Sequence, residues 1–136
     1  MEEYQEQGLT QKIIGAAIEV HKILGPGLLE SAYKSCLSFE FERMGLEYKQ
    51  EITVPFIYKN KRFDCGYRLD FLVEDKILIE LKSTEAFSPI HKAQLLTYMR
   101  LMNRQIGLLI NFNSLILKEG IRRCVLNASE PEKQSV

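Results

Sequence analysis

The chain has 136 residues, 46% of them hydrophobic and 26% charged, a composition typical of one globular domain. Its 18 basic and 18 acidic residues cancel, which excludes a global positive field, so nucleic-acid binding would require a local basic patch. The acidic start does not resemble a signal peptide, and no apolar run reaches the ~20 residues of a membrane span. We therefore expect one cytoplasmic domain over residues 1–136, with a core at about 9–126 and a polar tail at 127–136.

Two helices are predicted in the first third of the chain. In residues 10–24, apolar side chains recur at helical spacing after Thr10, a candidate N-cap. His21 lies near the end of this stripe and either supports the helix terminus or belongs to a site. The sequence Gly-Pro-Gly at 25–27 then interrupts the chain, and a second helix is expected at about 28–44, stopped by Gly45.

The second helix places a carboxylate on its apolar face. Glu30, Tyr33, Leu37, Phe41 and Met44 follow a helical repeat. An acid in the first turn favours the positive end of the helix dipole, which is one interpretation of Glu30. The other is that the helix delivers Glu30 as a ligand to a site on the neighbouring strands.

The middle of the chain predicts three antiparallel strands. Alternation over residues 52–58 indicates a strand near a sheet edge because of Pro55, followed by a turn at 59–61. Alternation resumes over 63–73, and a third strand covers 77–82. Ser88-Pro89 marks the start of a helix to about 102. The apolar run 105–112 then forms a strand parallel to an earlier one, and 115–117 and 121–126 complete the core of an α/β (α+β) fold with a mixed sheet.

The hairpin at 67–82 carries ionisable groups inside apolar strands. Glu80 and Lys82 are two residues apart and share one face. A three-residue loop pairs Val73 with Ile77 and sets Asp70 opposite Glu80, whereas a two-residue loop sends Asp70 to the other face. We predict the first register, because it gathers the acids.

Two adjacent carboxylates repel each other unless a cation lies between them. Oxygen ligands without a Cys or His cluster favour Mg²⁺ or Mn²⁺. Cys36, Cys65 and Cys124 are widely spaced and predict reduced, partly buried thiols, not a zinc site. A lysine beside such a metal can polarise a phosphate oxygen or position water, so the pattern indicates metal-assisted phosphodiester hydrolysis.

Three further side chains are candidates for contacts around this site. Arg68 shares the face of Asp70 and pairs either with an acid or with a phosphate. Gln94 and Tyr98 are four residues apart, and we expect them on the inner face of the third helix with Ile90 and Leu101.

Taken together, these motifs resemble the GxxExxY family, a branch of the PD-(D/E)xK nuclease-like superfamily. The naming motif matches Gly27, Glu30 and Tyr33, with His21 before it, and the resemblance extends from about Ile13 to Leu126. The superfamily's acid and E-x-K match Asp70, Glu80 and Lys82, although Leu69 replaces the proline. A helix-borne Q-x-x-x-Y matches Gln94 and Tyr98.

The resemblance implies a restriction-endonuclease-like αβββαβ core and a set of site residues. It implies that Glu30, Asp70, Glu80 and the Leu81 carbonyl bind Mg²⁺. It implies that Lys82 stabilises the attacking water or the phosphate, and that Gln94 and Tyr98 orient the lysine or contact the nucleic acid. Supporting or nucleic-acid contacts are also expected of Tyr33, Arg68 and His21.

The leading hypothesis is therefore a Mg²⁺- or Mn²⁺-dependent nuclease acting on nucleic acid, and we favour DNA as its substrate. The alternative is a non-catalytic or regulatory binding module that keeps the fold, which the neutral charge and small size favour. A third reading is hydrolysis of a small phosphate ester or nucleotide. A homodimer is also compatible with this assignment, because cutting both strands often uses two symmetric sites.

Overall fold

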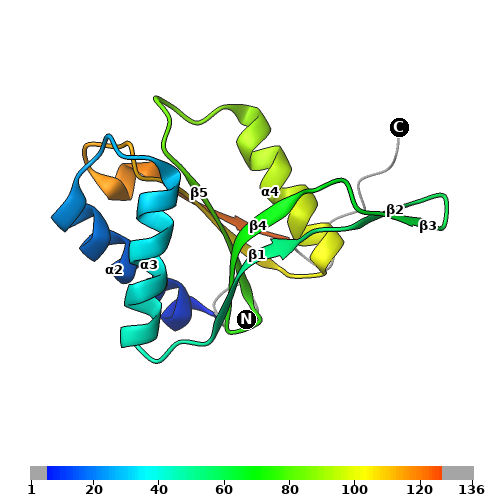
Figure 1. Ribbon diagram of the computed structural model, residues 1–136, viewed down its shortest axis with the longest axis horizontal. Coiled ribbons are helices and arrows are strands. Elements are labelled where there is room, and N and C mark those ends of the chain that lie inside the picture. Colours follow the sequence, from blue (N-terminus) through cyan, green and yellow to red (C-terminus); the bar gives the residue numbers. More distant parts are fainter. Residues whose placement is uncertain (1–5, 127–136) are drawn as a thin grey trace.

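The computed structural model describes residues 6–126, and its centre is a five-stranded mixed sheet of order β1-β4-β5-β6-β7 (Figure 1). β5 and β6 are parallel and all other neighbours are antiparallel, so the predicted mixed α/β architecture is confirmed. The strands are β1 (Tyr48–Thr53), β4 (Arg68–Val73), β5 (Ile77–Lys82), β6 (Ile106–Asn111) and β7 (Ile121–Val125).

Helices cover both faces of this sheet. On one face lie α2 (Gln7–Leu24) and α3 (Glu30–Arg43), and on the other lies α4 (Pro89–Met102), the crossover between β5 and β6 (Figure 1). A 3-10 helix, η1 (Leu117–Gly120), precedes β7. All six residues of β6 are buried, as expected of a central strand covered on both faces. In the described part of the chain no helix is long and apolar enough to cross a membrane.

The two faces of β5 differ in chemistry. Ile77, Ile79 and Leu81 pack into the core under α2 and α3 and are at most 1% exposed. On the opposite face, Leu78 packs under α4, and the strand then continues through Glu80 to Lys82. The strand is therefore apolar on one face and becomes charged towards its end on the other.

Two predictions in the α2 and η1 regions are wrong. Helix α2 begins at Gln7, so Thr10 lies inside the helix and caps nothing; its buried hydroxyl finds no partner among the described residues. Leu115 and Ile116 do not finish the core, because they are 89% and 58% exposed, and only Leu117 of that trio is buried. Cys36, Cys65 and Cys124 are free thiols, but Cys65 is exposed instead of partly buried.

The start of α4 and the burial of Tyr98 were predicted correctly, but Ile90 and Leu101 were wrongly placed on its inner face. Ser88 is the N-cap and its hydroxyl accepts a hydrogen bond from the Ile90 N–H at 3.2 Å. The buried face consists of Leu95, Tyr98 and Met99. Ile90 is 67% exposed and Leu101 42% exposed, so a second apolar stripe of α4 faces outward.

A two-stranded hairpin projects from the body of the molecule. It consists of β2 (Phe56–Tyr58) and β3 (Lys61–Phe63), and residues 56–63 are called the arm below (Figure 1). We predicted one strand over 52–58 with a buried face, but the strand is divided at Pro55, and Ile57 and Tyr58 are 67% and 60% exposed. The turn is the pair Lys59-Asn60, both with positive φ, as in a type I′ hairpin.

Candidate metal centre and active site

The site begins with the register of the β4–β5 hairpin. Val73 pairs with Ile77, and Phe71 pairs with Ile79, which confirms the three-residue loop at 74–76. Glu74 and Asp75 have φ values of 53° and 57°, and the Lys76 N–H donates to the Val73 carbonyl at 2.9 Å. This register sets position 70 directly opposite position 80.

Beyond Phe71 and Ile79, side chains take over the pairing between the two strands. The Asp70 N–H donates to Glu80 Oε1 at 2.9 Å, and the Leu81 N–H donates to Asp70 Oδ2 at 2.8 Å. Each carboxylate therefore accepts a hydrogen bond from the opposite strand, which fixes its orientation. The two acids are held together by the backbone and not by a flexible loop.

The charged form of Glu80 is unfavourable in this arrangement, because the residue is only 6% accessible to solvent. Burial and then the neighbouring Asp70 charge raise the pKa of Glu80 to about 8, and Glu30 adds to the rise. The hydrogen bond from the Asp70 backbone and the charge of Lys82 act in the opposite direction. A bound cation would relieve the burial of this second negative charge.

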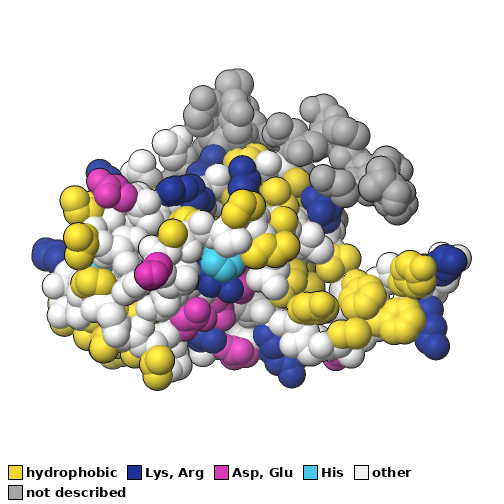
Figure 2. Space-filling model, turned by 90° about the horizontal axis from the view of Figure 1, so that it is seen from above, with side chains coloured by type: hydrophobic (Ala, Val, Ile, Leu, Met, Phe, Trp, Pro, Cys, Tyr) yellow, Lys and Arg dark blue, Asp and Glu magenta, His cyan; other side chains and the backbone are white. Residues whose placement is uncertain are grey.

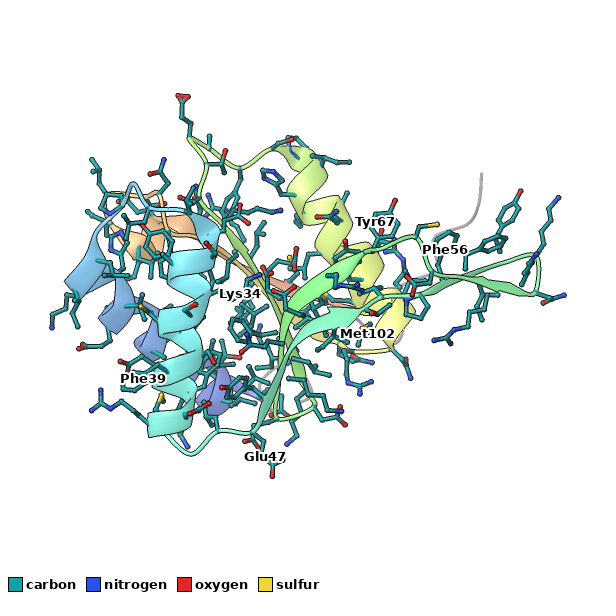
Figure 3. The ribbon with its side chains drawn as sticks, viewed as in Figure 1. Lys34, Phe39, Glu47, Phe56, Tyr67 and Met102 are labelled. Atoms are coloured by element: carbon teal, nitrogen blue, oxygen red, sulfur yellow. The ribbon has the colours of Figure 1, made fainter. Side chains whose placement is uncertain are left out.

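A lysine from α3, missed in the sequence, neutralises Asp70. Lys34 projects from α3 towards the central strands (Figure 3), and its Nζ lies 3.0 Å from Asp70 Oδ1. The same ammonium is paired with Glu51 on β1. Burial lowers the pKa of Lys34, but hydrogen bonds to Glu51 and Asp70 outweigh it, so the pKa is raised. The feature of the sequence that could have pointed to Lys34 is its position one helical turn after Glu30.

Glu51 lies opposite Asp70 in the β1–β4 register. The pairs on both sides set these two residues opposite each other, but Glu51 and Asp70 themselves are not paired in the ladder. Glu51 has φ 56°, a conformation that costs energy in a residue other than glycine. Asp70 thus has an acid on each neighbouring strand, Glu51 on β1 and Glu80 on β5.

Glu30 is not on the buried face predicted for it. It is the first residue of α3 and is exposed. Its influence on the pKa of Glu80 nevertheless brings it within electrostatic reach of the acids. Glu30 therefore lies at the exposed start of α3, within electrostatic range of Glu80.

Tyr33 and His21 hold the chain around the Gly-Pro-Gly turn. The Tyr33 hydroxyl donates to the Gly25 carbonyl at 2.6 Å and accepts from the Leu28 N–H at 3.1 Å. Its ring stacks on Phe112 at 4.4 Å between centroids. His21 Nε2 lies 2.7 Å from the Ser114 carbonyl oxygen and joins the end of α2 to the loop before η1. These contacts support positioning of α3 rather than chemistry at either ring.

The loop after β5 is tied to both sides of the site by contacts that the sequence did not reveal. Ser83 Oγ donates to the Leu28 carbonyl at 2.6 Å, linking the end of β5 to the start of α3. Asn111, 4% exposed, accepts from the Thr84 N–H and donates to the Thr84 carbonyl. In the sequence, the only indication of these contacts was Asn111, an amide at the end of a buried apolar strand.

The remaining predicted residues lie on the α4 side. Lys82, partly exposed at the end of β5, is close enough to Glu80 to lower its pKa. Tyr98 has a raised pKa because it is buried and near Glu80, Tyr67 and Asp70. Arg68 is exposed and donates to Thr53 Oγ1 at 2.6 Å, and among residues 6–126 it forms no ion pair with an acid, so the phosphate contact stays a prediction.

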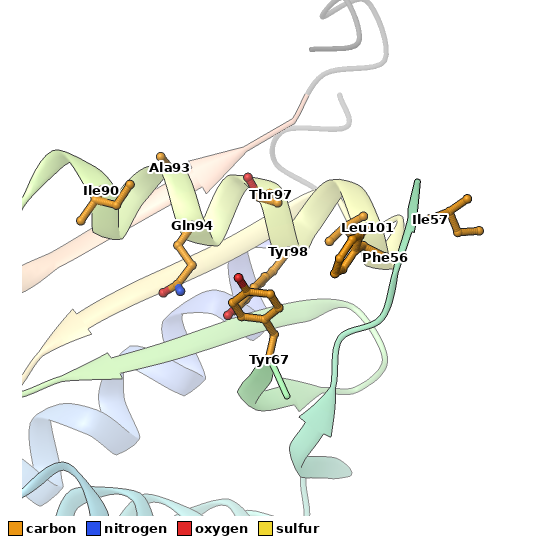
Figure 4. A pocket seen from close by; sticks show the side chains of 9 residues that line it. All are labelled: Phe56, Ile57, Tyr67, Ile90, Ala93, Gln94, Thr97, Tyr98 and Leu101. Carbon is orange, nitrogen blue, oxygen red and sulfur yellow. The ribbon is translucent and has the colours of Figure 1, made fainter. Parts of the chain in front are cut away.

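A groove lies on this side, between α4 and the arm (Figure 4). It has a volume of about 540 Å³. Gln94 and Tyr98 line it together with aromatic and aliphatic side chains of the arm, of α4 and of the segment just before β4. Tyr67 and Tyr98 lie side by side in it, with ring centroids 6.3 Å apart. The lining residues are Phe56, Ile57, Tyr67, Ile90, Ala93, Gln94, Thr97, Tyr98 and Leu101.

The carboxylates of this site fit Mg²⁺ or Mn²⁺ if the protein supplies few of the metal ligands and water supplies the others. Between residues 6 and 126, no group of three or more His, Cys, Asp or Glu side chains is arranged to hold a metal ion. Asp70 and Glu80 nevertheless supply two carboxyl groups whose orientation is fixed by hydrogen bonds from the opposite strand. Mg²⁺ is commonly held by one or two carboxylates and several waters, so this pair is a sufficient protein donor set.

The mixed sheet, the flanking helices and the opposed acids at the end of its central hairpin define a restriction-endonuclease-like protein. A family model of the PD-(D/E)XK nuclease superfamily matches residues 7–124, and the chain belongs to this superfamily. The chain matches no curated protein and no solved structure.

Proposed function

We propose that this protein is a divalent-metal-dependent nuclease of the GxxExxY branch that hydrolyses phosphodiester bonds in DNA. The observation that carries the proposal is a pair of cross-strand hydrogen bonds, from the Asp70 N–H to Glu80 and from the Leu81 N–H to Asp70, which holds two carboxylates together beside Lys82. Superfamily membership supports the reaction class. The branch assignment is supported by Gly27, with φ 102° in the turn, by Glu30 at the helix start and by Tyr33 clamping that turn.

In this proposal the residues have distinct tasks. Asp70 and Glu80 would hold Mg²⁺, with Glu30 and the Leu81 carbonyl as further ligands. The ion would lower the pKa of a water molecule and offset charge on the phosphate. Lys82 holds its ammonium beside the scissile phosphate and stabilises the negative charge that develops there. Gln94 and Tyr98 border the substrate on the α4 side.

Calorimetric titration with Mn²⁺ tests the site, with wild type compared to Glu80→Gln. We expect binding in wild type and at least tenfold weaker binding in the variant. Both samples are then assayed on single-stranded and duplex DNA, with exposed Glu119→Gln as the matched control. Wild-type affinity in both Glu80→Gln and Asp70→Asn would show that the proposed site is wrong.

One observation favours a second candidate function, a non-catalytic binding module. Lys34 already compensates Asp70, so the site has an internal cation that reduces the need for a metal. A structural ion pair of this kind predicts that Lys34→Met destabilises the fold and leaves metal affinity unchanged. A metal centre predicts instead that Lys34→Met tightens Mn²⁺ binding, because a competing positive charge is removed.

A further inference from the structure

The arm concentrates positive charge in a chain that is otherwise neutral. Lys59, Lys61 and Arg62 lie within four residues, and the arm contains no acid. All three are exposed, and within residues 6–126 none forms an ion pair with a carboxylate. This is the local basic patch that a zero net charge requires for binding a polyanion.

The same arm exposes aromatic and aliphatic side chains beside those charges. Tyr58 is 60% exposed with Lys59 Nζ 5.5 Å from its ring centre, and Ile57 is 67% exposed. In Figure 2 the arm projects at the right, with hydrophobic side chains flanked by Lys and Arg. Such apolar exposure on a projecting hairpin is costly in water unless a partner covers it.

The groove under the arm continues this surface to the acids. Its wall is the outward stripe of α4, where Ile90 and Leu101 are exposed, and Phe56 faces Leu101 across it (Figure 4). Tyr98 lines the groove and packs in the same buried cluster as Leu78, and Glu80 follows Leu78 on that face of β5. One end of the groove therefore lies on the same face of the sheet as Glu80 of the candidate metal centre.

The lining chemistry distinguishes single strands from duplexes. No Lys or Arg lines the groove, so duplex phosphates lying against it would lose hydration without gaining a charge partner. The bases of a single strand present apolar faces that stack on aromatic side chains, while its phosphates remain free to meet the basic residues. Aromatic rings in the groove and cations on the arm match both parts of a single strand.

We propose that the arm and the α4 groove bind a single-stranded DNA segment and lead it to Asp70 and Glu80. Bases stack on Tyr58 and Tyr67, and phosphates contact Lys59, Lys61 and Arg62. This inference deepens the proposed nuclease function and rests on it for the fate of the bound strand. Binding itself needs no metal and is measured separately from cleavage.

The test is fluorescence anisotropy in EDTA with a labelled 20-nucleotide single strand and the duplex of the same sequence. We expect wild type to bind the single strand at least tenfold more tightly. Tyr58→Ala should weaken it about tenfold and Tyr58→Phe should retain it, because stacking needs the ring. Phe39→Ala, exposed on α3, is the matched aromatic control and should bind as wild type does.

The charge contribution is tested by the triple variant Lys59→Ala/Lys61→Ala/Arg62→Ala. The slope of log affinity against log salt should fall by about 2, since each contact to a single strand contributes about 0.7. The matched control is Lys12→Ala/Lys22→Ala/Lys118→Ala, three exposed lysines outside the arm, which should leave the slope unchanged.

Several outcomes would overturn this inference. Equal affinity for duplex, or unchanged binding by the Tyr58→Ala and triple variants, would mean that DNA does not use this surface. A wild-type dimer that Tyr58→Ala dissociates would assign the surface to a second copy of the chain. Single-strand binding without any cleavage would support this inference and contradict the proposed nuclease function. Duplex cleavage that the arm variants leave unchanged would support the nuclease function and contradict this inference.

Discussion

The two faces of the central sheet have different roles. Under α2 and α3 lies a large apolar cluster, in which the rings of Phe41 and Tyr48 each pack edge to face with Phe71. Under α4 a second apolar cluster, in which Leu78, Leu95 and Leu109 are buried, adjoins Glu80 and the open groove. The difference teaches that the face under α2 and α3 is closed, whereas the face under α4 combines a buried cluster with an unfavourable charge and exposed rings.

The largest expected effect follows from a substitution in the core under α2 and α3, on the closed face of the sheet. Phe71 is completely buried, and Phe71→Ala should lower the free energy of unfolding by about 3–5 kcal/mol. Leu101→Ala, on the groove face and 42% exposed, should cost less than about 1 kcal/mol. Urea denaturation of both variants measures the contrast, and equal losses would contradict the division of roles between the faces.

The next effect belongs to the charged end of β5. Lys82→Ala should reduce cleavage about 10²–10³-fold, because it removes a cation aimed at developing negative charge. Its Mn²⁺ affinity and unfolding midpoint should remain close to wild type, since Lys82 is partly exposed and packs little apolar surface. Steady-state cleavage and calorimetry separate the two effects, with Lys76→Ala as an exposed lysine control. Loss of metal binding in Lys82→Ala would make it a structural residue.

A smaller effect concerns the buried charge on Glu80. Because its folded pKa is raised to about 8 from 4.5, the folded state holds a proton that the unfolded state has released between these values. Stability contributed by this proton is full below pH 4.5 and is lost as pH rises through about 8. In EDTA, Glu80→Gln should therefore be stabilising by up to about 4 kcal/mol at pH 8 and nearly neutral at pH 4.5.

Thermal unfolding at both pH values measures this difference. Gln retains an acceptor for the Asp70 N–H, so the variant tests charge more than hydrogen bonding. Glu119→Gln, exposed on η1, should show no comparable pH-dependent gain. A variant no more stable than wild type at pH 8 would mean that Glu80 carries its charge without penalty in the folded state.

The sequence predicts much of this fold because its strongest patterns are local. Alternation and loop length set the Val73–Ile77 register, Ser88-Pro89 starts α4, and the apolar run ending at Asn111 forms the buried parallel strand. Each is determined by a few neighbouring residues. The opposition of Asp70 and Glu80 then follows from the register alone.

The errors concern contacts between distant segments. Helical spacing cannot decide which of two apolar stripes on α4 faces the sheet, so Ile90 and Leu101 were placed inside. Nothing near Lys34 in the chain reveals that Glu51 and Asp70 meet it, because this requires the packing of α3 on β1 and β4. The arm was missed because alternation continues across Pro55 although the sheet does not.

The smallest expected effect tests whether the closed face also positions the site. Tyr33→Phe removes the hydroxyl that joins Gly25 to Leu28 but keeps the ring on Phe112, so it should cost about 1 kcal/mol of stability. If the Gly-Pro-Gly turn sets the direction of Glu30, Mn²⁺ affinity should also fall about two- to fivefold. The control is Tyr48→Phe, which loses bonds to Ser38 and Glu42 away from this turn. Equal metal affinity in the two variants would confine Tyr33 to stability, and the site would then depend on the β4–β5 hairpin alone.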